Sequence, residues 1–408
     1  MGFVDTMKSG DWLTAARIRD YSLILAGLTV VAVAALLATS NGMVDFQGRP
    51  LGTDFSNVWS AGRMVLDGHP SAPFDPLLHR AEQQAIFADP DIGFYGWHYP
   101  PFFLVAAALL ALLPYMTALA VWQAATLPAY LLTIRRILPA RGAVLAAAAF
   151  PAVLVNLTHG QNGFLTAGLI AGALLLVDRR PVLAGVLIGL LAYKPQFGIL
   201  IPLVLAVSGR WTAFVAAAAT VAAMAAATVA LFGIETWAAF LDSLPFTRTV
   251  VLEAGTTGWE KIQSLFAAVR MWGGPTGLAY GLQIALLAVL AAATAWLWRA
   301  GAPLALRASA LIVASLLATP YVLDYDMIVL GPAIAWFAAH GLERGFLTWE
   351  KSALALAFFA PLIARSIAGA ALVPVGLIAM TVLFAIIIRR ARHDLAPAPE
   401  GVPSHGRL

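Results

Sequence analysis

Apolar residues in this chain are gathered into long runs, and polar residues separate the runs. A helix that crosses a bilayer needs about 20 mostly apolar residues, although about 17 can suffice. Several of the runs are shorter than this, so their helices must borrow flanking residues or lie inside the protein. The runs are 21–39, 102–113, 115–134, 143–157, 164–177, 182–193, 197–207, 211–232, 276–298, 304–319, 327–340, 352–366 and 371–388.

Composition agrees with a membrane protein. The 408 residues are 61% hydrophobic and 11% charged, whereas a soluble domain carries about 25% charged residues. We therefore predict an all-α, polytopic transmembrane bundle that forms a single domain over residues 1–408. The absence of cysteine excludes disulfides, thiolate metal sites and a cysteine nucleophile. The net charge of +4 gives no reason to expect a nucleic-acid partner.

The basic residues predict the topology, because Lys and Arg are retained on the cytoplasmic side. If every run crossed in strict alternation, Arg135, Arg179 and Arg210 would face outward with their basic neighbours. The run 102–113 is short and lies between prolines. If it does not cross by itself, every basic cluster is predicted to lie on the cytoplasmic side. This predicts about 12 crossings with both termini cytoplasmic. The first run follows a basic start and lacks a good cleavage site, so we interpret it as a retained helix.

The same topology gathers the polar segments on the outer face. These are the first outer loop at 41–100, short breaks at 159–162 and 194–196, the second long loop at 233–262, and 320–326. The remaining basic segment, 389–408, becomes a cytoplasmic tail. Because the topology was inferred from other residues, this grouping supports an outward-facing site.

Two short amphipathic helices are predicted in the first outer loop. One begins at Phe55, after Asp54. The other begins at Asp75-Pro76, where aspartate caps and proline suits the first helical position. Its predicted buried stripe is Leu77, Leu78, Ala81, Ala85 and Ile86.

Asp54 has two interpretations. It can cap the helix that follows, or Thr53 can take that role and leave Asp54 as a base for an attacking hydroxyl. His98 and Tyr99 precede a double proline, which restricts Tyr99 to extended geometry. Tyr99 suits an interfacial aromatic belt, and His98 is either a hydrogen-bonded filler or a ligand contact.

The breaks between later runs hold further candidates. His159, Gln161 and Asn162 form either an interhelical turn or a set of hydrogen-bonding groups for a sugar or lipid phosphate. Lys194 lies near membrane depth, where ionisable residues are costly and often functional. It can bind a lipid phosphate, or its long side chain can reach the surface.

Four more charged residues remain open between structural and functional roles. Asp324 can cap a helix, and Asp326 can pair with a basic residue; either could instead line a site. Arg248 and Lys261 are solvated in the second loop or bind phosphate. Arg365 is a further charge within an apolar run, without an identifiable partner. We find no metal, haem, nucleotide or Ser-His-Asp pattern and predict no cofactor.

The ordered set of motifs resembles family 87 of the GT-C glycosyltransferases over residues 54–332. The motifs are Asp54, Gly68-His69-Pro70, Phe74-Asp75, Tyr99-Pro100-Pro101, Gly160-Gln161-Asn162, Lys194-Pro195-Gln196, Thr319-Pro320-Tyr321 and Tyr325-Asp326.

The resemblance implies an inner-membrane enzyme that moves a sugar, typically mannose, from a polyprenyl-phosphate donor to a lipid or glycan hydroxyl outside the membrane. It maps the catalytic base onto Asp54. Transfer with inversion also needs groups on the departing phosphate. The candidates for the donor are Lys194, His159, Gln161, Asn162, Arg248 and Lys261, with His98, Tyr99, Asp324 and Asp326 lining the site. The paired acids common in the class are absent after Asp54, so no metal is predicted.

The competing hypothesis is a transporter or flippase for a lipid-linked substrate, with Lys194, Asp324 and Arg365 as gating charges. Transporters often contain repeated halves with interrupted helices, and no repeat is visible here. The enzyme hypothesis requires that Asp54, Lys194 and His159 line one outward cavity.

Overall fold

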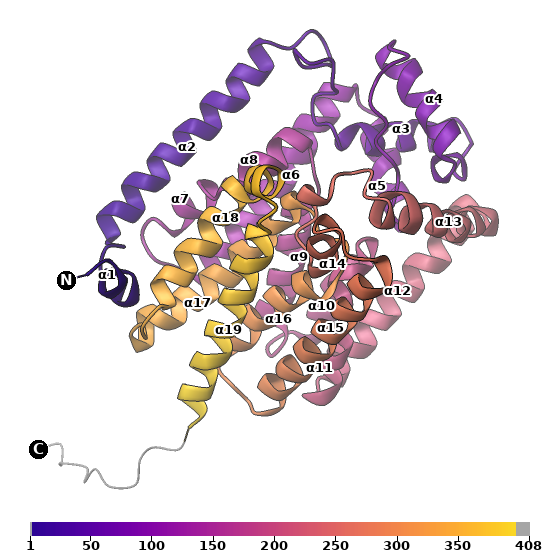
Figure 1. Ribbon diagram of the computed structural model, residues 1–408. Coiled ribbons are helices and arrows are strands. Elements are labelled where there is room, and N and C mark those ends of the chain that lie inside the picture. The colour runs from indigo at the N-terminus through magenta and orange to yellow at the C-terminus, as the bar shows by residue number, and fades with distance from the viewer. Residues whose placement is uncertain (1, 397–408) are drawn as a thin grey trace, which may run out of the picture.

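The computed structural model describes residues 2–396, so the part of the predicted tail at 397–408 lies outside the described residues. Within 2–396 the chain is all-α, as predicted, with isolated bridges but no β-strand. Figure 1 shows the helices gathered into one bundle, with α2 running along its edge.

Nineteen α-helices are found in the described part of the chain. They are α1 (Phe3–Ser9), α2 (Ala15–Ala38), α3 (Phe55–Leu66), α4 (Pro76–Phe87), α5 (Phe102–Ala111), α6 (Tyr115–Ile137), α7 (Ala143–Ala148), α8 (Pro151–His159), α9 (Gly163–Leu176), α10 (Pro181–Leu190), α11 (Ile201–Val207), α12 (Trp211–Phe232), α13 (Ile234–Phe246), α14 (Leu265–Met271), α15 (Thr276–Arg299), α16 (Leu304–Ala318), α17 (Leu330–Arg344), α18 (Glu350–Ala371) and α19 (Val375–Leu395).

Shorter 3₁₀ or π-helical turns connect these helices. They are η1 (Ala72–Phe74), η2 (Leu191–Tyr193), η3 (Pro195–Gly198), the π-helical η4 (Thr247–Glu253), η5 (Trp259–Lys261) and η6 (Asp324–Val329). The second long loop, 233–262, thus contains α13, η4 and η5.

Five helices among the described residues are long and apolar enough to cross a membrane: α2, α6, α12, α15 and α18. Shorter apolar helices accompany them. Helix α5 has 10 residues, which corresponds to a length of about 15 Å. That is about half the hydrocarbon thickness of a bilayer, so α5 is too short to cross alone. The total number of crossings stays a prediction.

The two ends of the described chain meet at one end of the bundle. The Trp349 amide donates to the Lys8 carbonyl oxygen, and Arg390 forms a buried ion pair with Glu350 at 3.2 Å. These contacts hold α1 and the last turns of α19 at the start of α18. In Figure 1 they lie at the lower left, whereas α3 and α4 lie at the upper right.

Helix α4 begins where predicted, and Asp75 caps it by accepting hydrogen bonds from the amides of Leu77 and Leu78. The predicted apolar stripe does not pack inside the protein, however. Leu77 is 79% exposed, whereas the polar His79 and Gln83 are buried. Hydrogen bonds made by His79 and Gln83 explain why this polar face is the buried one.

His79 Nε2 lies 2.7 Å from Ser60 Oγ of α3. The Gln83 side chain bonds both the amide and the carbonyl of Tyr95. Buried backbone groups need partners, and these polar side chains provide them, so the polar face of α4 turns inward.

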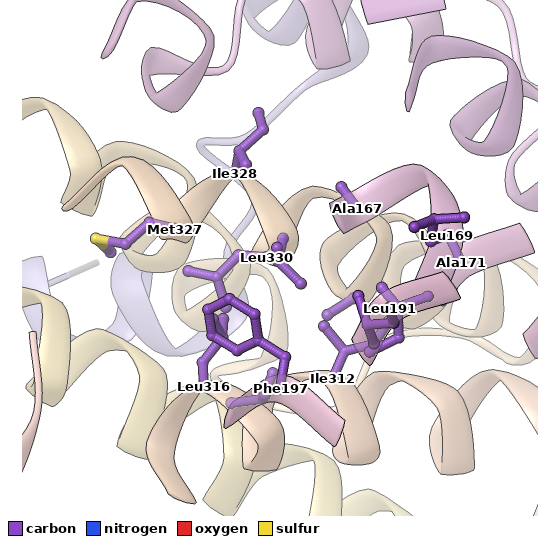
Figure 2. Close-up of a cluster of buried hydrophobic side chains, with 14 of the residues drawn as sticks. Ala167, Leu169, Ala171, Leu191, Phe197, Ile312, Leu316, Met327, Ile328 and Leu330 are labelled. Atoms are coloured by element: carbon purple, nitrogen blue, oxygen red, sulfur yellow. The ribbon is translucent and has the colours of Figure 1, made fainter. Parts of the chain in front are cut away.

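The apolar core lies where the interrupted helices meet. Figure 2 shows side chains from α9, η2, η3, α16, η6 and α17 packed together. Among them Leu191, Phe197, Leu316 and Met327 are buried. Lys194 lies between η2 and η3, and Asp326 lies within η6. The core therefore fixes the segments that carry these two charges.

Helices α10 and α12 approach closely through small residues. A Cβ added at Gly185 would meet the Ala213 carbonyl oxygen, and one added at Gly189 would lie 2.5 Å from Thr220 Cβ. Small residues allow such approach in membrane bundles, where van der Waals packing drives association.

We expect Gly185→Val to lower the free energy of unfolding by about 1–3 kcal/mol, as overpacked cores do. Thermal unfolding in detergent would measure the effect. Gly281→Val is the matched control, because a Cβ on Gly281 of α15 meets nothing within 4 Å. Equal melting temperatures for both variants would contradict this packing role.

Candidate active site

Four interruptions of helical structure meet at the end of the bundle away from the termini. They are the segment before α3, the turn between α8 and α9, the break between η2 and η3, and the loop between α16 and η6. Proline or glycine is present at each: Gly52, Gly160, Pro195 and Pro320. Polar side chains in these segments can face a common space because the local backbone is not committed to a continuous helix.

That space is a cavity of about 510 Å³, within the range of about 300–1,000 Å³ typical of ligand pockets. Nine of the predicted site residues line it. They are Asp54, His98, Tyr99, His159, Gln161, Lys194, Lys261, Asp324 and Asp326. Asp54, Lys194 and His159 thus line one cavity, which is the arrangement that the enzyme hypothesis requires.

Two predicted site residues do not line the cavity. The Asn162 side chain is buried behind Tyr99 and donates a hydrogen bond of 2.8 Å to its hydroxyl oxygen. The Arg248 side chain is 64% exposed and points to Glu253 at 3.5 Å. We therefore assign neither residue to direct donor binding.

Asp54 precedes α3, but its side chain makes no capping hydrogen bond. Its Oδ2 instead accepts a hydrogen bond of 2.7 Å from Gln161 Nε2. Thr53 does not take the cap either, because its buried hydroxyl has no partner among the described residues. The carboxylate of Asp54 is therefore directed into the cavity and is not used to end the helix.

Lys194 is already paired. Its Nζ lies 2.7 Å from Asp326 Oδ1, and both side chains are almost fully buried. Asp326 Oδ2 accepts the Leu323 amide at 3.0 Å. The structure contains both roles that the sequence left open for Asp326, because it pairs with Lys194 and also lines the cavity. The ammonium charge of Lys194 is largely balanced before any substrate binds.

Asp324 and Arg365 face each other across the cavity wall at 3.9 Å. Arg365 thus has a partner that the sequence did not reveal. Burial raises the pKa of Asp324, and the nearby His159 and Arg365 act in the opposite direction. Within residues 2–396, no group of three or more His, Asp and Glu residues is placed to hold a metal ion.

Comparison with protein families identifies the chain. The model of glycosyltransferase family 87 matches residues 97–320, which is 224 of 408 residues, or 55% of the sequence. The chain belongs to glycosyltransferase family 87. The comparisons with curated proteins and with solved structures give no match. The matched region contains the cavity residues from His98 to Lys261, but Asp54, Asp324 and Arg365 lie outside it.

Several cavity residues of this glycosyltransferase had no assigned role in the sequence analysis. Arg49 lines the cavity but is paired with Asp45 at 2.9 Å. The other unassigned lining residues include Tyr95, Tyr193, Tyr321 and Tyr325. Tyrosine is common near membrane interfaces, so its presence alone does not separate a site from an aromatic belt.

His98 is held neutral by its surroundings. Burial lowers its pKa from 6.5 to about 4, although the charge of Asp54 acts in the opposite direction. Its Nδ1 lies 2.9 Å from Thr247 Oγ1, which joins the end of the first outer loop to η4. His98 is therefore suited to hydrogen bonding rather than to carrying positive charge at neutral pH.

The ion pair yields a test of what Lys194 does in this glycosyltransferase. Lys194→Met leaves the buried Asp326 uncompensated, and we expect a loss of about 3–5 kcal/mol of stability. The double variant Lys194→Met/Asp326→Leu should regain most of it. Thermal unfolding of the purified enzyme measures both. A Lys194→Met enzyme of wild-type stability with a raised KM for the donor would instead make Lys194 a substrate ligand.

The depressed pKa of His98 yields a pH dependence. A histidine with a folded pKa of about 4 and an unfolded value near 6.5 takes up its proton more readily when unfolded. Its contribution to stability is complete above pH 6.5 and declines as the pH falls towards 4. His98→Asn should therefore show a smaller loss of melting temperature between pH 7 and pH 5 than the wild type. His69→Asn, at an exposed histidine, should behave as the wild type; equal slopes for all three proteins would contradict the assignment.

Proposed function

We propose that this glycosyltransferase moves a hexose, specifically mannose, from a polyprenyl-phosphate-sugar to a hydroxyl of a lipid or glycan acceptor. The transfer takes place on the outer face of the cell membrane, with inversion. The observation that carries the proposal is the position of Asp54, whose carboxylate lines the cavity without a cationic partner among residues 2–396.

In the proposed reaction Asp54 accepts the proton of the acceptor hydroxyl as that oxygen attacks the anomeric carbon. The bond between this carbon and the phosphate oxygen breaks, and polyprenyl phosphate leaves with the electron pair. A base in hydrogen-bond reach of the hydroxyl and positive charge at the leaving group both lower the barrier. Attack from the side opposite the phosphate accounts for inversion.

Lys261 supplies positive charge for the leaving phosphate, and Arg365 adds to it, with part of the Arg365 charge balanced by Asp324 at 3.9 Å. Both line the cavity, and Lys261 has no ion-pair partner among the described residues. They share one wall, because η5 packs on the end of α18. A Cβ on Gly369, one turn beyond Arg365, would lie 3.7 Å from Glu260 Cγ.

His159 lines the cavity with one ring nitrogen left to contact the donor. Its Nδ1 lies 2.8 Å from the Val155 carbonyl oxygen. Because a carbonyl can only accept, Nδ1 donates in this contact. Nε2 is therefore the ring nitrogen that can contact the sugar or the phosphate of a bound donor.

An apolar wall supports a lipid-linked donor. Phe246, Val250 and Val251 line the cavity from the end of α13 and from η4. Helix α13 also exposes the apolar side chains of Ile234, Leu241 and Leu244. A polyprenyl chain can lie on this surface while its phosphate reaches Lys261.

The positions of the basic residues support an outward-facing site. Arg210 and Arg307 pair with Asp178 at the end of α9 opposite the cavity. Arg307 lies near the start of α16, and Tyr321 of the cavity follows its end. Since basic clusters stay in the cytoplasm, the cavity belongs on the other side.

The transporter hypothesis loses its main support in this structure. Its three proposed gating charges are engaged in ion pairs, Lys194 with Asp326 and Arg365 with Asp324. Membership of a glycosyltransferase family also favours the enzyme.

The central test is transfer of labelled mannose from polyprenyl-phosphate-mannose to a membrane lipid extract. We expect Asp54→Asn to lose about 10²–10⁴-fold in rate, the usual contribution of a general base, with little change in stability. Asp75→Asn is the matched control, because asparagine also caps helices well and Asp75 lies outside the cavity. Full activity of Asp54→Asn would remove Asp54 from the mechanism.

A further inference from the structure

The turn between α8 and α9 holds Asp54 from two directions. The backbone amide of Asp54 donates to the His159 carbonyl oxygen at 3.0 Å. The side-chain amide of Gln161 donates to Asp54 Oδ2 at 2.7 Å. One short turn therefore fixes both the main chain and the side chain of the residue that precedes α3.

The orientation of the Gln161 amide is set by a neighbouring group. The Asn162 backbone N–H donates to Gln161 Oε1 at 3.1 Å. Only the carbonyl end of the side chain can accept this bond, so the NH₂ end faces Asp54. The side chain has no freedom to present its oxygen to the carboxylate without losing both bonds.

The turn itself is packed against the start of α3. Gly160 has a φ of 63°, and a Cβ there would lie 2.6 Å from Phe55 Cβ and 2.9 Å from Leu119 Cδ1. Glycine permits both the left-handed backbone and this close approach. The turn that carries Gln161 is therefore itself packed against the start of α3, next to the Asp54 side chain that Gln161 contacts.

From this geometry we propose that Gln161 is the positioning residue for Asp54, holding Oδ2 so that Oδ1 faces the acceptor hydroxyl. This rests on the proposed function of Asp54 and replaces the earlier expectation that Gln161 binds the donor. No described residue hydrogen-bonds to Oδ1, so that oxygen is open to the substrate.

A neutral amide suits this task better than a cation does. Lysine or arginine at this position would pair with the carboxylate and favour its charged form, which weakens it as a base. The amide bond also survives the reaction. When Oδ1 takes up the proton, Oδ2 remains an acceptor for Gln161, so Asp54 keeps its position in both protonation states.

The test compares Gln161→Ala and Gln161→Glu with the wild type in the mannose transfer assay, with kcat, donor KM and pH dependence measured for each. We expect Gln161→Ala to lower kcat about 10- to 100-fold, since small misplacements of catalytic groups cost up to about 10²-fold, with donor KM changed less than about twofold. Gln161→Glu places a second carboxyl group against Asp54. Two adjacent carboxyl groups repel each other when both are ionised, which raises one of their pKa values. The pH below which the rate falls should therefore be higher by about one pH unit or more than in the wild type.

Gln123→Ala is the matched control. Gln123 donates to the Asn156 carbonyl oxygen outside the cavity, and this variant should retain wild-type rates and pH dependence. A raised donor KM with unchanged kcat in Gln161→Ala, or an unshifted profile in Gln161→Glu, would overturn the proposal. If Gln161→Ala fails to fold, the profile of the nearly isosteric Gln161→Glu decides. Absence of mannose transfer by the wild type would instead refute the proposed function, and full activity of Asp54→Asn would remove Asp54 from the mechanism, so these failures are distinguishable from failure of the Gln161 proposal.

Discussion

Lys194 and Asp326 are buried against each other at the point where two interrupted segments of the bundle meet. Lys194 lies between η2 and η3, and Asp326 lies in η6 beyond α16. A buried ion pair adds little net stability, yet leaving either partner alone is costly. The pair therefore requires that these segments stay together, and their neighbours Phe197 and Met327 belong to the apolar core shown in Figure 2. The part of the cavity that Lys194 and Asp326 line therefore depends on this ion pair.

The outer wall of the cavity follows a different physical rule. Here buried polar side chains satisfy backbone groups that no regular helix satisfies, as Gln83 does for Tyr95 and Gln161 does for the Asn162 amide. Because of these bonds, the polar face of α4 packs inside the protein. The loop between α8 and α9 likewise holds the segment before α3 by hydrogen bonds. The result is a carboxylate at Asp54 that is held by a neutral donor and left open on one side.

Family membership and site geometry contribute different parts of the functional conclusion. The family model covers residues 97–320 and establishes a glycosyltransferase. Asp54, Asp324 and Arg365 lie outside that region. Asp324 follows it closely, in η6, whereas Asp54 and Arg365 reach the cavity because the first outer loop and α18 fold onto it. The base role proposed for Asp54 comes from the resemblance and agrees with its place in the cavity, and the phosphate-binding roles proposed for Lys261 and Arg365 draw on the three-dimensional arrangement rather than on the match.

The sequence by itself determined the all-α membrane bundle, the helix starts at Phe55 and Asp75-Pro76, and most of the cavity residues. Long apolar runs, caps and polar breaks are local signals, and they can be seen in one dimension. It did not determine that Lys194 is neutralised by Asp326, 132 positions away, or that Arg365 meets Asp324. It also did not show which face of α4 packs inside the protein, because an apolar stripe does not reveal which backbone groups need partners. Only the tertiary structure decides which charged side chains lie close enough to pair. The pairing in turn separates residues that stabilise the cavity from residues that can contact a substrate.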